Sequence, residues 1–451
     1  MKTLRLASFG IRGFVGESLT PEVVLDLASA FGTFVQGGRV LVGRDTRTSS
    51  PMLSYAVIAG LVSTGCEVLD FGVCPTPLLQ FSVERYGAAG AVSISAGHTR
   101  VGWNALSLIG SSGAFIEPLG GETVLDIFHA RDFLRQPWNR QGSVRVVTDF
   151  TQPYFDALEY RLDTPAIRTR KFTVVFDPVN GAGCRFLQPL AERLGLNLIA
   201  INAEESGYTA HDPEPRPRNA KQVAAIIRPV RGDIGFVASS DMGRLAIVTE
   251  EGETASEEYT FALIANHVLA KRTGVLVTNC CTTRTVDDIA QAHGARVVKT
   301  PVGQAYVMAA LADEDGLIGG EGNGSVALPA FSRAFDGFLM AGLILEAMAQ
   351  TGKKASELLL RLPRYHIVKR QVYGPPRRCY RALESLQTRR DWMEDGRMDM
   401  TDGIRLDWED GWLHLRASQT EPMIRIISES RCRQRAEDRA STVARLLEQE
   451  L

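Results

Sequence analysis

Residues 39–47, RVLVGRDTR, decide the fold class of this chain, because they describe a short buried strand that ends in a charged turn. Two later stretches have the same pattern, FTVVFDPVNGAG at 172–183 and GVLVTNCCTTR at 274–284. After each of the three comes a helix-length segment and then a second apolar strand introduced by glycine. Helix-length segments between short apolar strands are typical of βαβ units with parallel or mixed sheets. We therefore expect an α/β unit that is repeated three times. Its second strands lie in STGCEVLDFG (63–72), RLGLNLIAINAE (193–204) and AHGARVVKTPVG (292–303).

The pattern changes after about Leu362. A strand-like HIVKRQVYG at 366–374 is followed by a helix-like segment and then by GIRLDWEDGWLHLRAS at 403–418, in which apolar and polar residues alternate. Glu409-Asp410-Gly411 within this stretch predicts a hairpin turn. The tail at 433–450 has the pattern of an amphipathic helix. These features predict a smaller α+β domain at the end of the chain.

Length and composition narrow the class of protein. A chain of 451 residues is expected to form several domains, and 45% apolar with 23% charged residues is ordinary for a globular protein. The net charge of −2 predicts no nucleic-acid and no membrane partner. Residues 1–10, MKTLRLASFG, do not resemble a secretory signal, and no apolar run could cross a bilayer, so we expect a cytoplasmic protein. The composition leaves the oligomeric state open.

Seven cysteines are scattered along the chain. Only Cys280 and Cys281 are close together in the sequence, and adjacent cysteines match neither a disulfide framework nor C-x-x-C zinc spacing. We expect reduced, buried thiols.

The most specific stretch for function is RASQTEPMIRIISES at 416–430. Guanidinium groups, hydroxyls and loop amides that converge between two strands suit a dianionic phosphate, because arginine can bind it with two parallel hydrogen bonds. The predicted phosphate-binding residues are Arg416, Ser418, Gln419, Thr420 and Arg425.

This stretch closely resembles the phosphate-binding loop of the α-D-phosphohexomutases, the phosphoglucomutase and phosphomannomutase family, whose pattern is R-x-S-G-T-E-P-x-x-R. One position differs, where Gln419 replaces glycine. Further matches occur in the family's order along nearly the whole chain: FGIRGFVGESLTPEVV from 9, VGRDTRTSS from 42, FDPVNGAG from 176, HDPEPRPRN from 211, GGEGNG from 319 and FDGF from 335.

The resemblance implies the architecture of the family. We expect three similar α/β domains with mixed sheets and a C-terminal α+β domain, all arranged around a central cleft. The predicted domain boundaries are 1–143, 144–248, 249–361 and 362–451.

Family members carry a phosphoserine in a loop of the pattern T-A-S-H-N-P, and the matching residues here begin at Ser95 and place Gly97 at the phosphoryl donor. Glycine has no oxygen that can carry a phosphoryl group. His98 matches the loop histidine, a candidate for proton transfer, and Arg12 matches an arginine that lies near this loop in the family. Arg47, together with Arg44, is expected to tie the first domain together through Asp45.

The family holds magnesium with three carboxylates in the pattern D-G-D-x-D-R. The matching stretch, SSDMGR at 239–244, has Ser239, Asp241 and Gly243 at these positions, so Asp241 is the one carboxylate that remains. Magnesium is usually held by carboxylates and phosphate oxygens. We therefore expect no metal and no other cofactor.

The family's sugar-binding loop, G-G-E-x-S-G-H, is partly matched by GGEGNGSV at 319–326. Glu321 is kept and is expected to accept hydrogen bonds from sugar hydroxyls. Asn323 replaces the serine, and Ser325 replaces the histidine. All three are candidate substrate-binding residues.

Three hypotheses for function follow, and the sequence does not decide whether the protein is an enzyme. The leading one is a phosphohexomutase-like protein that binds a hexose phosphate or a related phosphorylated metabolite without running the phosphoserine and magnesium cycle. It would be a non-catalytic binder, or an enzyme for isomerisation, epimerisation or elimination that uses His98 and Glu321. The alternative is an active phosphosugar mutase with a substitute phosphoryl carrier, either Ser95 or a bound bisphosphate. The third is an interaction protein with an empty cleft.

Overall fold

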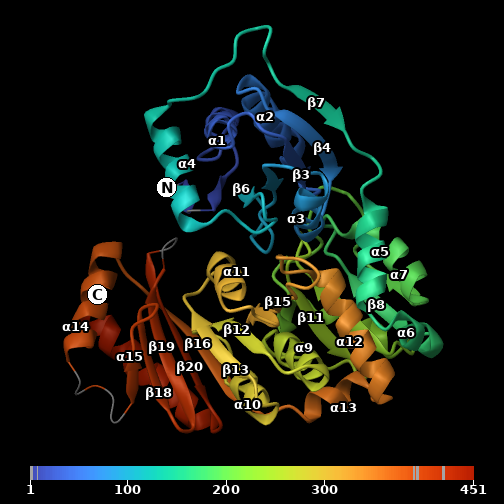
Figure 1. Ribbon diagram of the computed structural model, residues 1–451. Helices are drawn as coiled ribbons and strands as arrows, with labels where there is room; N and C mark the ends of the chain where they lie inside the picture. Colours follow the sequence, from blue (N-terminus) through green and yellow to red (C-terminus); the bar gives the residue numbers. More distant parts are fainter. Residues whose placement is uncertain (1–3, 8, 390–391, 393–395, 419–421) are drawn as a thin grey trace. The chain divides into compact units, whose positions relative to one another are not determined.

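The computed structural model describes residues 4–7, 9–389, 392, 396–418 and 422–451 (Figure 1). The chain divides into two compact units. The first contains residues 1–267 and 323–360, and the second contains residues 268–322 and 361–451. In the described part of the chain, no helix has both the length and the apolar character that crossing a membrane requires.

The first sheet belongs to the first unit and has seven strands, in the spatial order β1 (Arg5–Ala7), β2 (Gly10–Phe14), β6 (Trp103–Gly110), β5 (Gly90–Ile94), β3 (Val40–Arg44), β4 (Glu67–Val73) and β7 (Ser143–Val146). Strand β3 is parallel to β4 and β5, whereas β6 is antiparallel to β5. The helices are α1 (Pro21–Phe34), α2 (Ser50–Ser63), α3 (Thr76–Arg85) and α4 (Pro118–Ala130). Apolar residues of α1, α2 and α4 pack on the strands in one core, and the prolines at the helix starts suit the first turn because their φ is already helical.

The second sheet lies in the same unit and has four strands, in the order β11 (Leu245–Thr249), β10 (Ile234–Ala238), β8 (Thr173–Asp177) and β9 (Asn197–Ala200). Its helical segments are α5 (Thr151–Arg161), α6 (Thr164–Arg170), the 3-10 turn η1 (Cys184–Phe186), α7 (Leu187–Leu194), the 3-10 turn η2 (Pro217–Asn219) and α8 (Lys221–Ile227). The long helix α9 (Glu258–Lys271) follows β11 along the chain.

The returning segment of the first unit contains β15 (Ser325–Ala327), α12 (Gly337–Thr351) and α13 (Ala355–Leu360). Helix α12 is buried along most of its length. Its start is fixed by Asp336, whose carboxylate accepts hydrogen bonds from the backbone N–H groups of Phe338 and Leu339. The hydroxyl of Tyr154 also donates to this buried carboxylate.

In the second unit, β12 (Val275–Asn279) lies between β13 (Arg296–Thr300) and β14 (Ile318–Glu321) and is parallel to both. Two helices, α10 (Thr285–Ala292) and α11 (Gln304–Asp313), connect these strands. The sequence therefore forms a third α/β unit here, as the repeat predicts.

The C-terminal sheet is also in the second unit and has the order β16 (His366–Tyr373), β20 (Met423–Ser430), β19 (Gly411–Ala417), β18 (Ile404–Trp408) and β17 (Arg397–Asp399), with all neighbours antiparallel. The predicted turn at Glu409-Asp410 joins β18 to β19. Helices α14 (Pro376–Thr388) and α15 (Arg433–Glu450) pack on the sheet, as Figure 1 shows.

The threefold repeat is confirmed strand by strand. The predicted strands at 39–47, 172–183 and 274–284 are β3, β8 and β12. Each of these strands lies between two parallel neighbours of its own repeat. Strand β3 lies between β4 and β5, β8 lies between β9 and β10, and β12 lies between β13 and β14. The loops predicted for catalysis, metal binding and sugar binding therefore occupy equivalent positions at the carboxyl ends of β5, β10 and β14.

The predicted fold class is confirmed, with three mixed or parallel α/β sheets followed by an α+β domain. The predicted domain boundaries remain a prediction. Strand β7 begins at the first of them, residue 143, and pairs with β4 of the first sheet.

Candidate active site

The loop at residues 95–100 directly follows β5, and hydrogen bonds hold its backbone at Gly97. The carbonyl oxygen of Gly97 accepts hydrogen bonds from Ser240 Oγ (2.7 Å) and Arg47 Nη2 (3.3 Å). The backbone N–H of Gly97 donates to Ser95 Oγ (3.1 Å). Arg47 Nη2 also donates to the carbonyl oxygen of Thr99 (2.7 Å). These contacts hold the backbone of the loop against both the first and the second sheet.

A buried carboxylate lies beside Ser95. Ser95 Oγ donates to Asp45 Oδ2 (2.8 Å), and Asp45 also accepts from Ser50 Oγ (2.5 Å) and Arg47 Nε (3.1 Å). Arg47 ties the first domain together through Asp45 as expected, whereas Arg44 Nη1 donates to the backbone carbonyl oxygen of Asp45, its neighbour in the sequence (3.2 Å). The hydrogen bond between Ser95 and Asp45 was not predicted.

Gly97 and Asp241 are packed directly against each other. Gly97 has a φ of +52°, and a Cβ at this position would lie 2.6 Å from Asp241 Oδ2 and 3.1 Å from its Cγ. The other carboxylate oxygen, Oδ1, accepts from Ser239 Oγ (2.5 Å) and from the N–H of Gly243 (3.0 Å). The carboxylate thus stands where a side chain of residue 97 would begin.

Two further predicted residues, His98 and Arg12, lie at this loop. His98 is half-buried in the turn that follows Gly97. Arg12, on β2, donates from Nη1 to Thr99 Oγ1 (3.1 Å), so the structure brings it to the loop as expected. Arg100 is 80% exposed, and its Nε lies 3.7 Å from Asp212 Oδ2.

The motifs FDPVNGAG and HDPEPRPRN meet near the loop at 239–244. His211 Nε2 lies 2.9 Å from Asp177 Oδ2 at the end of β8, and Glu214 Oε1 lies 3.4 Å from Arg244 Nη1. Burial lowers the pKa of His211, but its hydrogen bond and charge interaction with Asp177 outweigh this, and the pKa is raised. These contacts of His211 and Glu214 stabilise the fold.

The sugar-binding candidates divide between the two units. In the first unit, Ser325 Oγ donates to the carbonyl oxygen of Gly243 (3.1 Å), and Asn323 is half-buried two residues earlier. In the second unit, Glu321 ends β14 and is 5% exposed. Its Oε1 accepts from Asn279 Nδ2 (2.9 Å) and from the N–H of Gly303 (3.0 Å), so the carboxylate is held in one orientation.

The predicted phosphate-binding loop joins β19 to β20. Arg416 and Arg425 lie directly opposite each other on these strands, and the N–H of Ser418 donates to the carbonyl oxygen of Met423 (2.9 Å). Opposed like charges destabilise a strand pair unless an anion compensates them, so the arrangement suits a phosphate. Arg416 Nε also pairs with Asp402 Oδ1 (3.1 Å), a contact that no motif predicts. The candidates Gln419 and Thr420 lie outside the described residues.

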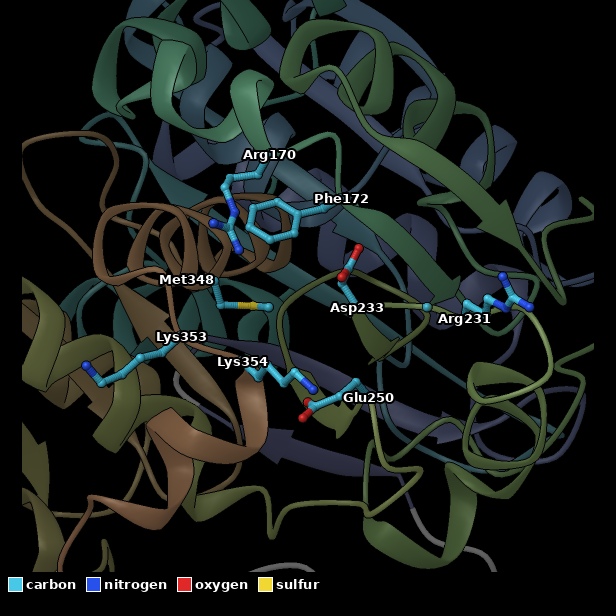
Figure 2. Close-up of a pocket in the computed structure, with 9 residues that line it drawn as sticks. Arg170, Phe172, Arg231, Asp233, Glu250, Met348, Lys353 and Lys354 are labelled. Atoms are coloured by element: carbon cyan, nitrogen blue, oxygen red, sulfur yellow. The ribbon is translucent and has the colours of Figure 1, made fainter.

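A pocket elsewhere in the first unit contains none of the predicted site residues (Figure 2). It lies at the amino end of β8 and β10, whereas the loops described above follow the carboxyl ends of their strands. Ligands of open α/β sheets bind at the carboxyl ends. The pocket is lined by Arg170, Phe172, Arg231, Gly232, Asp233, Glu250, Met348, Lys353 and Lys354.

Three family models match most of the chain. They are described as phosphoglucomutase/phosphomannomutase alpha/beta/alpha domains I, II and III and match residues 6–135, 152–252 and 256–365. A phosphoglucomutase/phosphomannomutase of Thermococcus kodakarensis is 38% identical over 98% of both chains. A probable phosphoglucosamine mutase of Pyrococcus abyssi is 34% identical over 95% of this chain and 94% of that one.

Solved structures show the same fold. A phosphoglucomutase/phosphomannomutase family protein from Burkholderia thailandensis superposes with a TM-score of 0.87, covering 99% of this chain and 98% of that one at 23% identity. An N-acetylphosphoglucosamine mutase of Aspergillus fumigatus, solved with GlcNAc-6P and magnesium, covers 100% and 96% at a TM-score of 0.61 and 14% identity.

These findings correct one prediction and reorder the hypotheses for function. The prediction that no cofactor takes part is wrong, because the relatives are phosphohexomutases and one of them is solved with magnesium. An active phosphosugar mutase, the alternative hypothesis, agrees with the relatives better than a non-catalytic binder does. From its full-length similarity and its three matching domains, the chain belongs to the phosphoglucomutase/phosphomannomutase family.

Proposed function

We propose that this protein is a phosphosugar mutase, an intramolecular phosphotransferase that moves a phosphoryl group between two oxygens of a hexose phosphate. Glucose and mannose phosphates are the proposed substrates, because the Thermococcus relative is named for them. One observation carries the proposal. The backbone of the loop after β5 is hydrogen-bonded to Ser95 Oγ, and this hydroxyl donates to a buried carboxylate.

Ser95 is the proposed phosphoryl carrier. It is partly exposed, whereas Ser93 is 2% exposed and is hydrogen-bonded to Thr76 Oγ1 (2.8 Å). A serine is a weak nucleophile until a neighbouring base takes its proton. Asp45, 2.8 Å from Ser95 Oγ, is positioned for that role.

The proposed reaction consists of two phosphoryl transfers. Phospho-Ser95 gives its phosphoryl group to the free hydroxyl of a sugar monophosphate, so the P–Oγ bond breaks and a new P–O bond to the sugar forms. The proton of the sugar hydroxyl passes to His98, and Ser95 Oγ takes a proton from Asp45. The sugar bisphosphate turns around, and its other phosphoryl group returns to Ser95 by the reverse steps, with the same two residues exchanging the same protons.

The loop at 239–244 fits magnesium only in part. Asp241 is its single carboxylate, and in the described part of the chain no three carboxylates lie close enough to share an ion. Magnesium is commonly held by one or two carboxylates together with substrate phosphates and water. Asp241 Oδ2 would therefore be the protein ligand of the ion. When bound, magnesium would supply positive charge to offset the charge that develops on the transferred phosphoryl group.

Residues of the second unit are proposed to recognise the substrate. Glu321 would accept hydrogen bonds from sugar hydroxyls, since its orientation is already fixed by Asn279. Arg416, Arg425 and Ser418 would bind the phosphate that is not being transferred. Binding energy at this remote phosphate holds the reacting end in position, which is how such contacts raise the rate of transfer.

The experiment is a mutase assay on the full chain with glucose 1-phosphate, mannose 1-phosphate and glucosamine 1-phosphate, in the presence of magnesium and a hexose bisphosphate. Turnover of at least one sugar phosphate is expected, and intact-mass analysis should show one added phosphoryl group. Ser95→Ala should lose both, while Ser93→Ala serves as the matched control and should keep both.

The outcomes separate the hypotheses. Absence of turnover combined with a thermal shift on adding sugar phosphate would reject the mutase and favour a non-catalytic binder. Full turnover by Ser95→Ala would reject Ser95 as the carrier and point to the bound bisphosphate instead.

A further inference from the structure

Two thiols and an imidazole converge at one point in the second unit, although 133 positions separate Cys281 from His414 in the sequence. Cys280 and Cys281 form the turn after β12, and His414 lies on β19. Cys281 Sγ is 3.0 Å from His414 Nδ1, and Cys280 Sγ is 3.7 Å from His414 Nε2. One ligand atom from each of the three residues lies within 4.8 Å of the others.

The hydrogen bonds of His414 prepare its ring for metal binding. Nε2 lies within hydrogen-bond distance of the carbonyl oxygen of Asp402, which can only accept. Nε2 therefore carries the proton, and the lone pair of Nδ1 faces Cys281. Histidines that bind metals commonly donate their other N–H to a carbonyl or carboxylate in this way.

Two members of the cluster are buried, and Cys281 is partly exposed. Cys280 is 2% exposed and His414 is 1% exposed. The guanidinium of Arg405 donates to the carbonyl oxygen of Cys280 and lies over the ring of Trp412, 4.5 Å from its centre.

We propose that Cys280, Cys281 and His414 form a binding site for Zn²⁺, separate from the magnesium site of the phosphoryl transfer. Thiolate and imidazole ligands select zinc over magnesium, and three protein ligands leave a fourth tetrahedral position for water. Zinc–sulfur and zinc–nitrogen bonds of about 2.3 and 2.0 Å place sulfur and nitrogen roughly 3.5 Å apart around the ion. The observed separation of 3.0 Å between Cys281 Sγ and His414 Nδ1 is close to this value, and the ligand atoms of the three residues all lie within 4.8 Å of one another.

The position of the site gives it a structural connection to sugar binding. Asn279 immediately precedes the two cysteines, and its Oδ1 accepts from the N–H of Cys281 (2.8 Å). The same side chain donates to Glu321 Oε1 (2.9 Å). The metal would therefore be bound one residue away from the group that orients Glu321.

Cobalt(II) titration of the reduced full-length protein tests the proposal, because cobalt replaces zinc in thiolate sites and gives a thiolate charge-transfer absorption. We expect one cobalt per chain, an absorption in the near ultraviolet, and its loss on adding one equivalent of Zn²⁺. Cys281→Ser and His414→Gln should weaken binding by more than about tenfold. Cys432→Ser, at an exposed cysteine of the same unit, is the matched control and should bind normally.

Folding of each variant is checked by circular dichroism, and the nearly isosteric Cys280→Ser provides a second ligand variant should His414→Gln unfold. A reduced protein without the absorption would overturn the proposal. So would an absorption that persists in a folded protein carrying both Cys280→Ser and Cys281→Ser, since the thiolates would then lie elsewhere.

Discussion

Replacing Gly97 with alanine is expected to destabilise the protein by about 2.5 kcal/mol. Part of this cost comes from the backbone, since a φ of +52° costs an L-residue about 1 kcal/mol relative to glycine. The rest comes from Asp241, because the new Cβ would lie 2.6 Å from Oδ2 and must displace the carboxylate. Displacement weakens the 2.5 Å hydrogen bond from Ser239, and a hydrogen bond to a charged group contributes about 1.5 kcal/mol at the lower end of its range.

Gly87→Ala is the matched control. Gly87 has almost the same φ, +56°, but a Cβ there meets nothing within 4 Å. It should therefore show only the backbone cost of about 1 kcal/mol. The free energy of unfolding is measured by urea titration followed by circular dichroism, with the slope of the transition checked for constancy among the variants.

A double-mutant cycle isolates the contact. In a protein that already carries Asp241→Ala, the Gly97→Ala change should cost only about 1 kcal/mol, because no carboxylate has to move. Equal costs for Gly97→Ala and Gly87→Ala, or equal costs with and without Asp241, would refute the idea that this carboxylate occupies the place of a side chain.

Two further predictions concern charges. Burial raises the pKa of the Asp336 carboxyl group to about 6, although Tyr154 donates a hydrogen bond to it. Below pH 6 the folded protein therefore favours the neutral acid. The stability that this group contributes is full below pH 4 and is lost as the pH rises through 6. The free energy of unfolding of the wild type minus that of Asp336→Asn should fall by about 3 kcal/mol between pH 4 and pH 7, and a constant difference would contradict the shift. Arg425→Glu should place an opposite charge across from Arg416 and stabilise the unliganded protein by up to about 0.5 kcal/mol, a small gain because Asp402 already pairs with Arg416. The same change should abolish the thermal shift caused by glucose 1-phosphate, and a retained shift would place the phosphate elsewhere.

The sequence predicts those parts of the fold that depend on local pattern. Strands β3, β8 and β12 are recognisable because each is a short apolar run followed by a turn, and their helices follow within a few residues. The hairpin at Glu409-Asp410 is equally local. The opposition of Arg416 and Arg425 follows from a short loop between two strands, so the predicted phosphate-binding pair is found together.

Contacts between distant segments are not predictable in this way. Ser95 and Asp45 are 50 residues apart, and both are ordinary polar residues at the ends of strands until the parallel pairing of β3 with β5 brings them together. His414 gives no signal as a ligand, because it takes a polar position in the alternating pattern of its strand and the cysteines lack a zinc spacing, whereas the structure buries both faces of β19. The prediction of no cofactor failed for a different reason. It counted protein carboxylates at positions 239–243, although a substrate phosphate also supplies magnesium ligands.

The departures of this chain from the family pattern are physically connected. In the family pattern a phosphoserine and three carboxylates concentrate negative charge, which a cation must neutralise. Here glycine at 97 offers no oxygen for a phosphate, and the Asp241 carboxylate lies where a Cβ of residue 97 would be. Ser239 and Gly243, at the two positions that have lost carboxylates, donate hydrogen bonds to Asp241. They stabilise and orient the carboxylate through Oδ1. A mutase built on this loop must carry the phosphoryl group on another oxygen, and Ser95 is the loop hydroxyl that already has a carboxylate to take its proton.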